Sequence, residues 1–116
     1  MNADHEGALP EEALRMLGLA IRSHQVSLGQ DRVERMLRGG RVAGVWIARD
    51  LARNAAYKVR RACERAGVPC WSAGTSADLG ARTGRDGVKV YILHRGRLGE
   101  RVMDLLARDQ ADSEAE

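Results

Sequence analysis

Phenylalanine is absent from this chain of 116 residues, and its only aromatic side chains belong to two Trp and two Tyr residues. The core must therefore be aliphatic, and few side chains are available to stack on bases across the surface of a sheet. No apolar run is long enough to span a bilayer. The acidic start, MNADHEGALPEE, also lacks the basic and apolar segments of a secretion signal. We therefore expect a cytoplasmic protein that has no membrane partner.

The sequence also lacks the motifs of common enzyme classes. It contains no Gly-rich nucleotide-binding pattern, no GxSxG and no HExxH. His24 and His94 are isolated in the sequence, which favours surface or loop-edge positions over a role as general base. Cys63 and Cys70 form no CxxC pair and have no histidine cluster near them, so we interpret them as reduced, partly buried thiols. We expect a protein that is not an enzyme and that has no cofactor and no metal.

Acidic residues concentrate at the two ends of the chain and conceal a basic body. The formal net charge is +3, but eight of the 16 acidic residues lie in the first twelve and last eight positions. All 19 Lys and Arg residues lie between Arg15 and Arg108. A basic body of this size favours a polyanionic partner, although an Arg-rich composition alone would produce the same excess.

Helical and strand patterns alternate along the body. The apolar run at 42–48 is typical of a strand that is buried on both faces. The other expected elements are strands at 26–28, 69–72 and 88–93 and helices that begin near 10, 30, 51, 75 and 98. This alternation predicts an α/β fold, a three-layer α/β/α sandwich with a central mixed sheet of about four strands. We expect a single domain over 9–108, with flexible acidic tails at 1–8 and 109–116.

Several helix ends carry recognisable signals. The pair Gly39-Gly40 is expected to end the second helix. Thr75 is expected to cap the next short helix, with Asp78 three residues on, and Gly80 is expected to close it. Asp50, which follows a strand, is interpreted as a capping residue.

Three strings, in this order and spacing, resemble a known family. They are LRMLGLAIRSHQVSLGQDRVERMLRGG (14–40), VAGVWIARDLARNAAYKVRRACERAGVPC (42–70) and SADLGARTGRDGVKVYIL (76–93). The chain resembles the kink-turn RNA-binding ribosomal proteins, the L-seven-Ae and L-thirty-e group, and its bacterial YlxQ-like members look closest. The resemblance covers about 14–93 and implies RNA contacts from the start of the second helix and from the loop before the last strand.

The family motif G-x-N-E-x-x-K falls at the start of the second helix, which begins at Gln30. Gly29 matches its glycine, Asp31 its Asn, Arg32 its Glu and Arg35 its Lys. The resemblance implies that these side chains read guanines while the helix start and neighbouring cations hold phosphates. Asp31 loses the amide donor of the family Asn, and Arg32 reverses the charge of the family Glu.

Independent of the resemblance, Arg32, Arg35 and Arg38 recur at helical spacing and form an exposed cationic face. A solvated helix face is the alternative reading of this spacing. The expected loop, 81–87, adds the candidate contacts Arg82, Thr83 and Arg85.

We therefore predict an RNA-binding protein that recognises structured, kink-turn-like RNA, either ribosomal or another cytoplasmic RNA. Its partners would include the ribosome or the translation or transcription machinery, and the free protein would be a monomer. Two alternatives stay open. One is a protein-interaction module on the same fold with an eroded RNA site. The other is a substrate-recognition subunit of an RNA-modifying enzyme.

Overall fold

A five-stranded mixed sheet forms the centre of the molecule. The computed structural model describes residues 4–5 and 9–115. In chain order the elements are β1 (Asp4–His5), α1 (Glu11–Arg22), β2 (Val26–Leu28), the 3-10 helix η1 (Gln30–Arg32), α2 (Val33–Gly39), β3 (Val42–Ile47), α3 (Arg53–Ala66), β4 (Cys70–Ala73), α4 (Ser76–Thr83), β5 (Val90–His94) and α5 (Arg97–Ala115). None of the described helices is long and apolar enough to cross a membrane.

Strand β3 lies in the middle of the sheet, and all six of its residues are buried. The strand order is β1-β4-β3-β5-β2. Strand β3 pairs parallel with β4 and antiparallel with β5, which in turn pairs antiparallel with β2. A strand with a neighbour on each side and helices over both faces makes no contact with water, and this explains the apolar run at 42–48.

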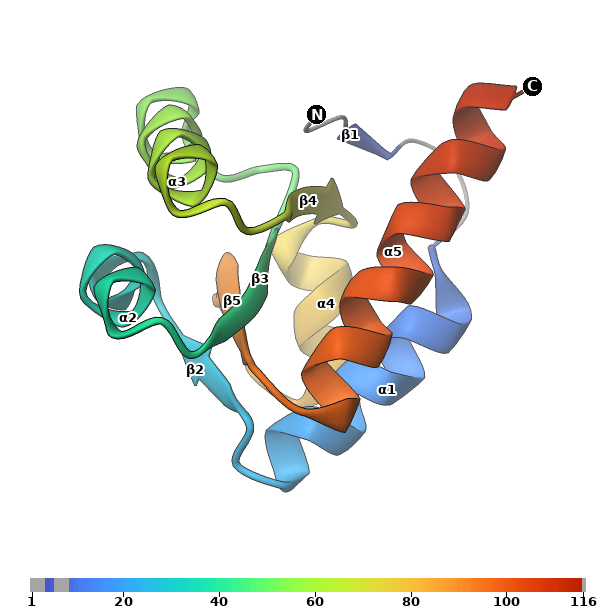
Figure 1. Cartoon of the computed structure of the whole chain (residues 1–116). Helices are drawn as coiled ribbons and strands as arrows, with labels where there is room; N and C mark the ends of the chain where they lie inside the picture. The colour runs from blue at the N-terminus through green and yellow to red at the C-terminus, as the bar shows by residue number, and fades with distance from the viewer. Residues whose placement is uncertain (1–3, 6–8, 116) are drawn as a thin grey trace.

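Helices cover both faces of this sheet (Figure 1). Helices α1, α4 and α5 lie on one face, and α2 and α3 lie on the other. Alternate residues of the strands point to opposite cores. Trp46 and Tyr91 pack with α1, α4 and α5, whereas Val45 and Ile92 pack with α2 and α3. The predicted three-layer α/β/α sandwich is therefore confirmed.

The expected tails cover 1–8 and 109–116, and the last helix runs into the second of them. Helix α5 continues to Ala115, and the side chain of Gln110 is only 3% exposed. Gln110 follows the buried Leu106 by one helical turn, so the packed stripe of α5 extends beyond residue 108. At the other end, Asp4 and His5 form the short strand β1 beside β4, and the rest of 1–8 lies outside the described residues.

Helix α4 ends later than the sequence predicts. The helix continues through Gly80 to Thr83, and Gly84 closes it with φ +77°. A Cβ at position 80 would lie 3.2 Å from the Arg85 carbonyl oxygen and 3.4 Å from Asp86 Cα. Gly80 therefore allows the loop that follows to fold back onto the helix, and it does not terminate the helix.

Three other signals act as predicted. Gly40, with φ +73°, ends α2. The Thr75 hydroxyl accepts a hydrogen bond from the Asp78 backbone N–H at 3.1 Å. Asp50 is a capping residue, but it caps α4 from across the chain, because its carboxylate accepts hydrogen bonds from the Ser76 N–H and hydroxyl at 2.8 and 2.6 Å.

Candidate nucleic-acid interface

The turn at Gly29 joins β2 to the predicted recognition helix. Gly29 has φ +105°, a region that L side chains rarely adopt, although space around its Cα is open. Its N–H donates to the Val90 carbonyl oxygen at 3.0 Å. This hydrogen bond places the start of η1 beside the first residue of β5, and so beside the end of the loop that precedes β5.

The helix predicted from residue 30 begins with one 3-10 turn before α2. Across η1 and α2 only Val33 is fully buried, and it packs beneath α3. All five predicted contact residues after Gly29 on this segment are exposed, namely Gln30, Asp31, Arg32, Arg35 and Arg38. The segment is thus held to the core by few side chains and presents the rest to solvent.

Some of the predicted contact residues line a groove between this segment and α3, and others lie outside the groove. Gln30 and Asp31 line a hollow of about 270 Å³ together with Lys58 of α3. Arg38 lines an adjoining hollow of about 380 Å³ beside Arg65. Arg32 and Arg35 line neither hollow, so the arginines that the sequence grouped on one face are divided between the groove and the outer surface of α2.

Sequence reasoning missed Lys58, which joins this site from α3. Nothing in the local pattern marks Lys58, because its contact with the Gln30 region arises only when α3 packs beside α2. Lys89, which lies outside this groove, was also missed, because it meets Asp50 only when the end of β3 pairs with the start of β5. Its carbonyl oxygen accepts the Ala48 N–H at 2.9 Å. The hydrogen bond from the Ser76 hydroxyl holds the pKa of the Asp50 carboxyl below its usual value, and the Lys89 cation lowers this pKa further.

Only one of the three side chains expected in the loop before the last strand lies in that loop. Arg82 and Thr83 belong to the last turn of α4 and not to the loop. Arg82 forms a two-armed ion pair with Glu11 of α1, at 2.6 and 3.0 Å, which lowers the pKa of the Glu11 carboxyl. The Thr83 hydroxyl donates to the Leu79 carbonyl oxygen at 2.8 Å. Of the three, only Arg85 is an exposed side chain in the loop itself.

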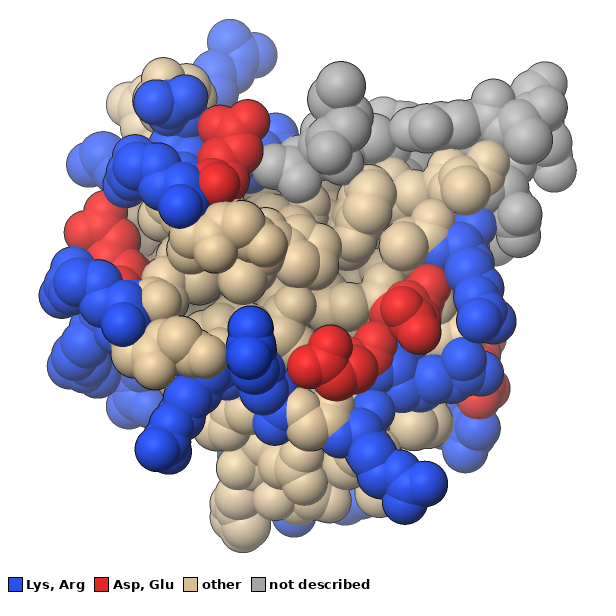
Figure 2. Space-filling view, viewed as in Figure 1, with Lys and Arg blue, Asp and Glu red and all other residues tan. Residues whose placement is uncertain are grey.

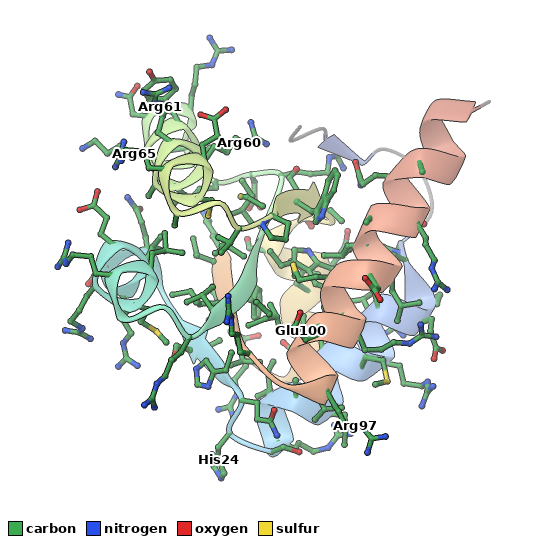
Figure 3. The ribbon with its side chains drawn as sticks, viewed as in Figure 1. His24, Arg60, Arg61, Arg65, Arg97 and Glu100 are labelled. Carbon is green, nitrogen blue, oxygen red and sulfur yellow. The ribbon has the colours of Figure 1, made fainter. Side chains whose placement is uncertain are left out.

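Cationic side chains gather over α2 and α3. Figure 2 shows Lys and Arg predominating on the side of the molecule that these helices form, with a few acidic side chains among them, and both signs of charge on the α5 side. Helix α3 alone carries five cationic side chains and one carboxylate. Figure 3 shows Arg60, Arg61 and Arg65 pointing from α3 in three different directions. The positive potential therefore surrounds α3 and is not confined to its α2 side.

His94 is the last residue of β5 and has a hydrogen-bond partner on the neighbouring strand. Its Nε2 lies 2.8 Å from the Ser27 hydroxyl, and the hydrogen bond joins the edge strand β2 to β5. His24 occupies the turn before β2 with φ +59°. Within the described part of the chain, no group of three or more His, Cys, Asp or Glu side chains could hold a metal ion.

Cys63 and Cys70 are free thiols, and each is 1% exposed in the core beneath α3. The hydrogen bond with Cys70, followed by burial, raises the pKa of the Cys63 thiol. Cys63 therefore stays protonated at neutral pH.

Solved structures share this three-layer fold. A protein of unknown function from Bacillus halodurans C is 23% identical, with a TM-score of 0.78 over 83% of this chain and 97% of that one. The Giardia lamblia 15.5kD RNA binding protein is 21% identical, with a TM-score of 0.78 over 93% of this chain and 92% of that one. No family model and no curated protein matches the sequence.

Proposed function

We propose that this chain binds structured RNA as a protein of the ribosomal-protein type. One observation carries the proposal. The turn at Gly29 leads into a helix start on which Gln30, Asp31, Arg32 and Arg35 are all exposed, so that they add nothing to the core. Exposed cations suit phosphates and base edges.

The charge around α3 supports the same partner. Lys58 faces the groove beside Gln30, and Arg38 and Arg65 continue the cationic surface along it. Two carboxylates, Asp31 and Glu34, also line the groove. They would repel phosphates locally, so phosphates are expected to contact the cations on either side. The shared fold with the Giardia protein is consistent with this function.

The finer proposal is recognition of a kink-turn-like element, as in the L-seven-Ae and L-thirty-e group and its YlxQ-like members. In this proposal Arg35 supplies a bidentate contact to a guanine, and Arg85 contacts the backbone from the loop before β5. We further propose that the protein is a cytoplasmic, monomeric binder that works without catalysis or a cofactor. Its RNA would be ribosomal or belong to another ribonucleoprotein of the translation or transcription machinery.

Titration of the whole chain against a kink-turn RNA and a duplex of equal length tests the proposal. We expect tighter binding to the kink-turn. We also expect log affinity to fall linearly with log salt concentration, because cationic side chains release counterions from phosphates. Equal affinity for both RNAs would reject kink-turn recognition, and the absence of binding at low salt would reject RNA binding altogether.

A protein partner is the second candidate, and the hollow between α2 and α3 favours it. Leu37, Ala62 and Ala66 form its apolar lining, and the ion pair between Glu34 and Arg65, at 4.0 Å, lies at the same hollow. If no RNA binds, this surface becomes the leading candidate for the functional site.

A further inference from the structure

Helix α3 has a second groove on the side that faces away from α2. Two hollows of about 390 and 360 Å³ share Tyr57 and Arg60 as lining residues. The first also reaches Arg49 and Arg53 at the end of β3 and the start of α3, and the second reaches Trp71 of β4. We call these two hollows the outer groove. Each has a volume within the range of pockets that hold small ligands.

Among the described residues, Tyr57 is the most exposed large apolar side chain. It is 64% exposed, whereas the only other such side chain, Leu19, is 38% exposed. Tyr57 therefore packs little against the core and holds an aromatic ring in solvent at the junction of the two hollows. A ring in this position offers a flat surface on which one nucleotide base can stack.

Cations surround this ring. Arg53 lies one helical turn before Tyr57 and Arg61 lies one turn after it, and both side chains are exposed. Figure 3 shows Arg60 and Arg61 pointing in different directions from the same stretch of α3. The single carboxylate of α3, Glu64, lies 3.5 Å from Arg61. An aromatic surface among arginines is the combination that single-stranded nucleic acid requires, because the ring binds a base and the arginines bind phosphates.

The outer groove lies across α3 from the surface proposed to bind structured RNA. Lys58 lines the groove beside Gln30 and Asp31, and its neighbour Tyr57 lines the outer groove. A strand that leaves a structured element held at η1 therefore needs to cross only the width of α3 to reach Tyr57.

We infer that the outer groove binds a single-stranded segment of the same RNA, with one base stacked on Tyr57 and the flanking phosphates held by Arg53 and Arg61. This inference rests on the proposed function and deepens it, because it gives the RNA two parts, a structured element and a single-stranded extension. It also separates the two sides of α3 by the kind of RNA that each contacts.

The test compares the structured RNA with and without a single-stranded extension of roughly ten nucleotides, a length within the site sizes of single-strand binders. A free uridine oligonucleotide of the same length forms a second arm. Fluorescence anisotropy would measure the affinity of the whole chain and of the variants Tyr57→Ala, Tyr57→Phe and Arg53→Ala. Arg101→Ala, an exposed arginine on α5, is the matched control.

We expect the extension to tighten binding and Tyr57→Ala to remove that gain. Loss of one stacked base weakens binding roughly 5- to 150-fold. Tyr57→Phe should retain the gain, because it keeps the ring. Arg53→Ala should reduce it, whereas Arg101→Ala should leave it unchanged.

Three results would overturn the inference. They are an extension that adds no affinity, a Tyr57→Ala variant that binds the extended RNA as well as the original chain does, and a Tyr57→Ala variant that weakens both RNAs equally. In each case tight binding of the unextended RNA would leave the proposed function intact. If the structured RNA does not bind, the oligonucleotide arm decides alone. Binding that is lost with Tyr57→Ala supports the outer groove, and its absence rejects it.

Discussion

Arg35 lies on the outer surface of α2, one turn beyond η1, and Arg35→Ala tests whether this surface contacts RNA. The side chain is exposed and lines neither hollow of the groove beside α3. The fold should therefore tolerate its removal. Any loss of binding can then be attributed to a contact with RNA.

The expected magnitudes follow from that position. An exposed substitution away from special features changes the free energy of unfolding by no more than about 0.5 kcal/mol. A bidentate contact to guanine contributes about 1–3 kcal/mol of binding, which corresponds to a weakening of roughly 5- to 150-fold. A contact to phosphate alone would weaken all RNAs similarly and lower the salt slope by about one.

The assay titrates the original chain, Arg35→Ala and the control Arg101→Ala against a kink-turn RNA and an unkinked duplex at several salt concentrations. We expect Arg35→Ala to lose affinity mainly for the kink-turn and to keep its unfolding midpoint in urea. If Arg35→Ala binds both RNAs as tightly as the control does, α2 is not the RNA surface and the site assignment is wrong.

Three further predictions concern neighbouring features. Asp31→Asn combined with Arg32→Glu restores the family pair. Gel-shift titrations should show weaker duplex binding, because cationic charge is lost, but a larger preference for the kink-turn. An equal loss of affinity for both RNAs would mean that Arg32 contacts RNA in another way. Gly99→Ala should destabilise the fold by about 1–3 kcal/mol or more in urea unfolding, because a Cβ there would overlap the backbone carbonyl at the end of β5. Gly39→Ala is its control and should be neutral or stabilising, because a Cβ at that position meets nothing within 4 Å. If the two substitutions change the free energy of unfolding equally, the packing argument is refuted. Asp50→Ala should cost about 1 kcal/mol at neutral pH, as loss of a cap does. Folding lowers the pKa of the Asp50 carboxyl, so its contribution to stability is complete above the ordinary pKa of 3.8 and is lost as the pH falls through the lower folded value. Melting curves of the variant and the original chain should therefore converge in acid. A difference that persists in acid would contradict the cap.

The sequence by itself determined the order of elements and the central strand. The run Val42–Ile47 is buried because six adjacent residues without a charge are stable only between two layers of helices. The cap at Thr75 and the stop at Gly40 were also predictable, because each depends on backbone groups within a few residues of the signal. The exposure of Arg35 and Arg38 was equally predictable, since helical spacing turns both away from the buried Val33.

Only the tertiary structure decided which of these positions meet. Gly80 was expected to end α4, but its missing Cβ instead admits the backbone at Arg85, a contact that arises only when the loop folds back. Arg82 is held by Glu11, which lies 71 positions away in the chain. Lys58 joins the groove beside Gln30 because α3 packs on α2. Local propensity depends on neighbours in sequence, whereas a binding surface depends on distances between segments, and these distances are set by how the helices pack on the two faces of the sheet.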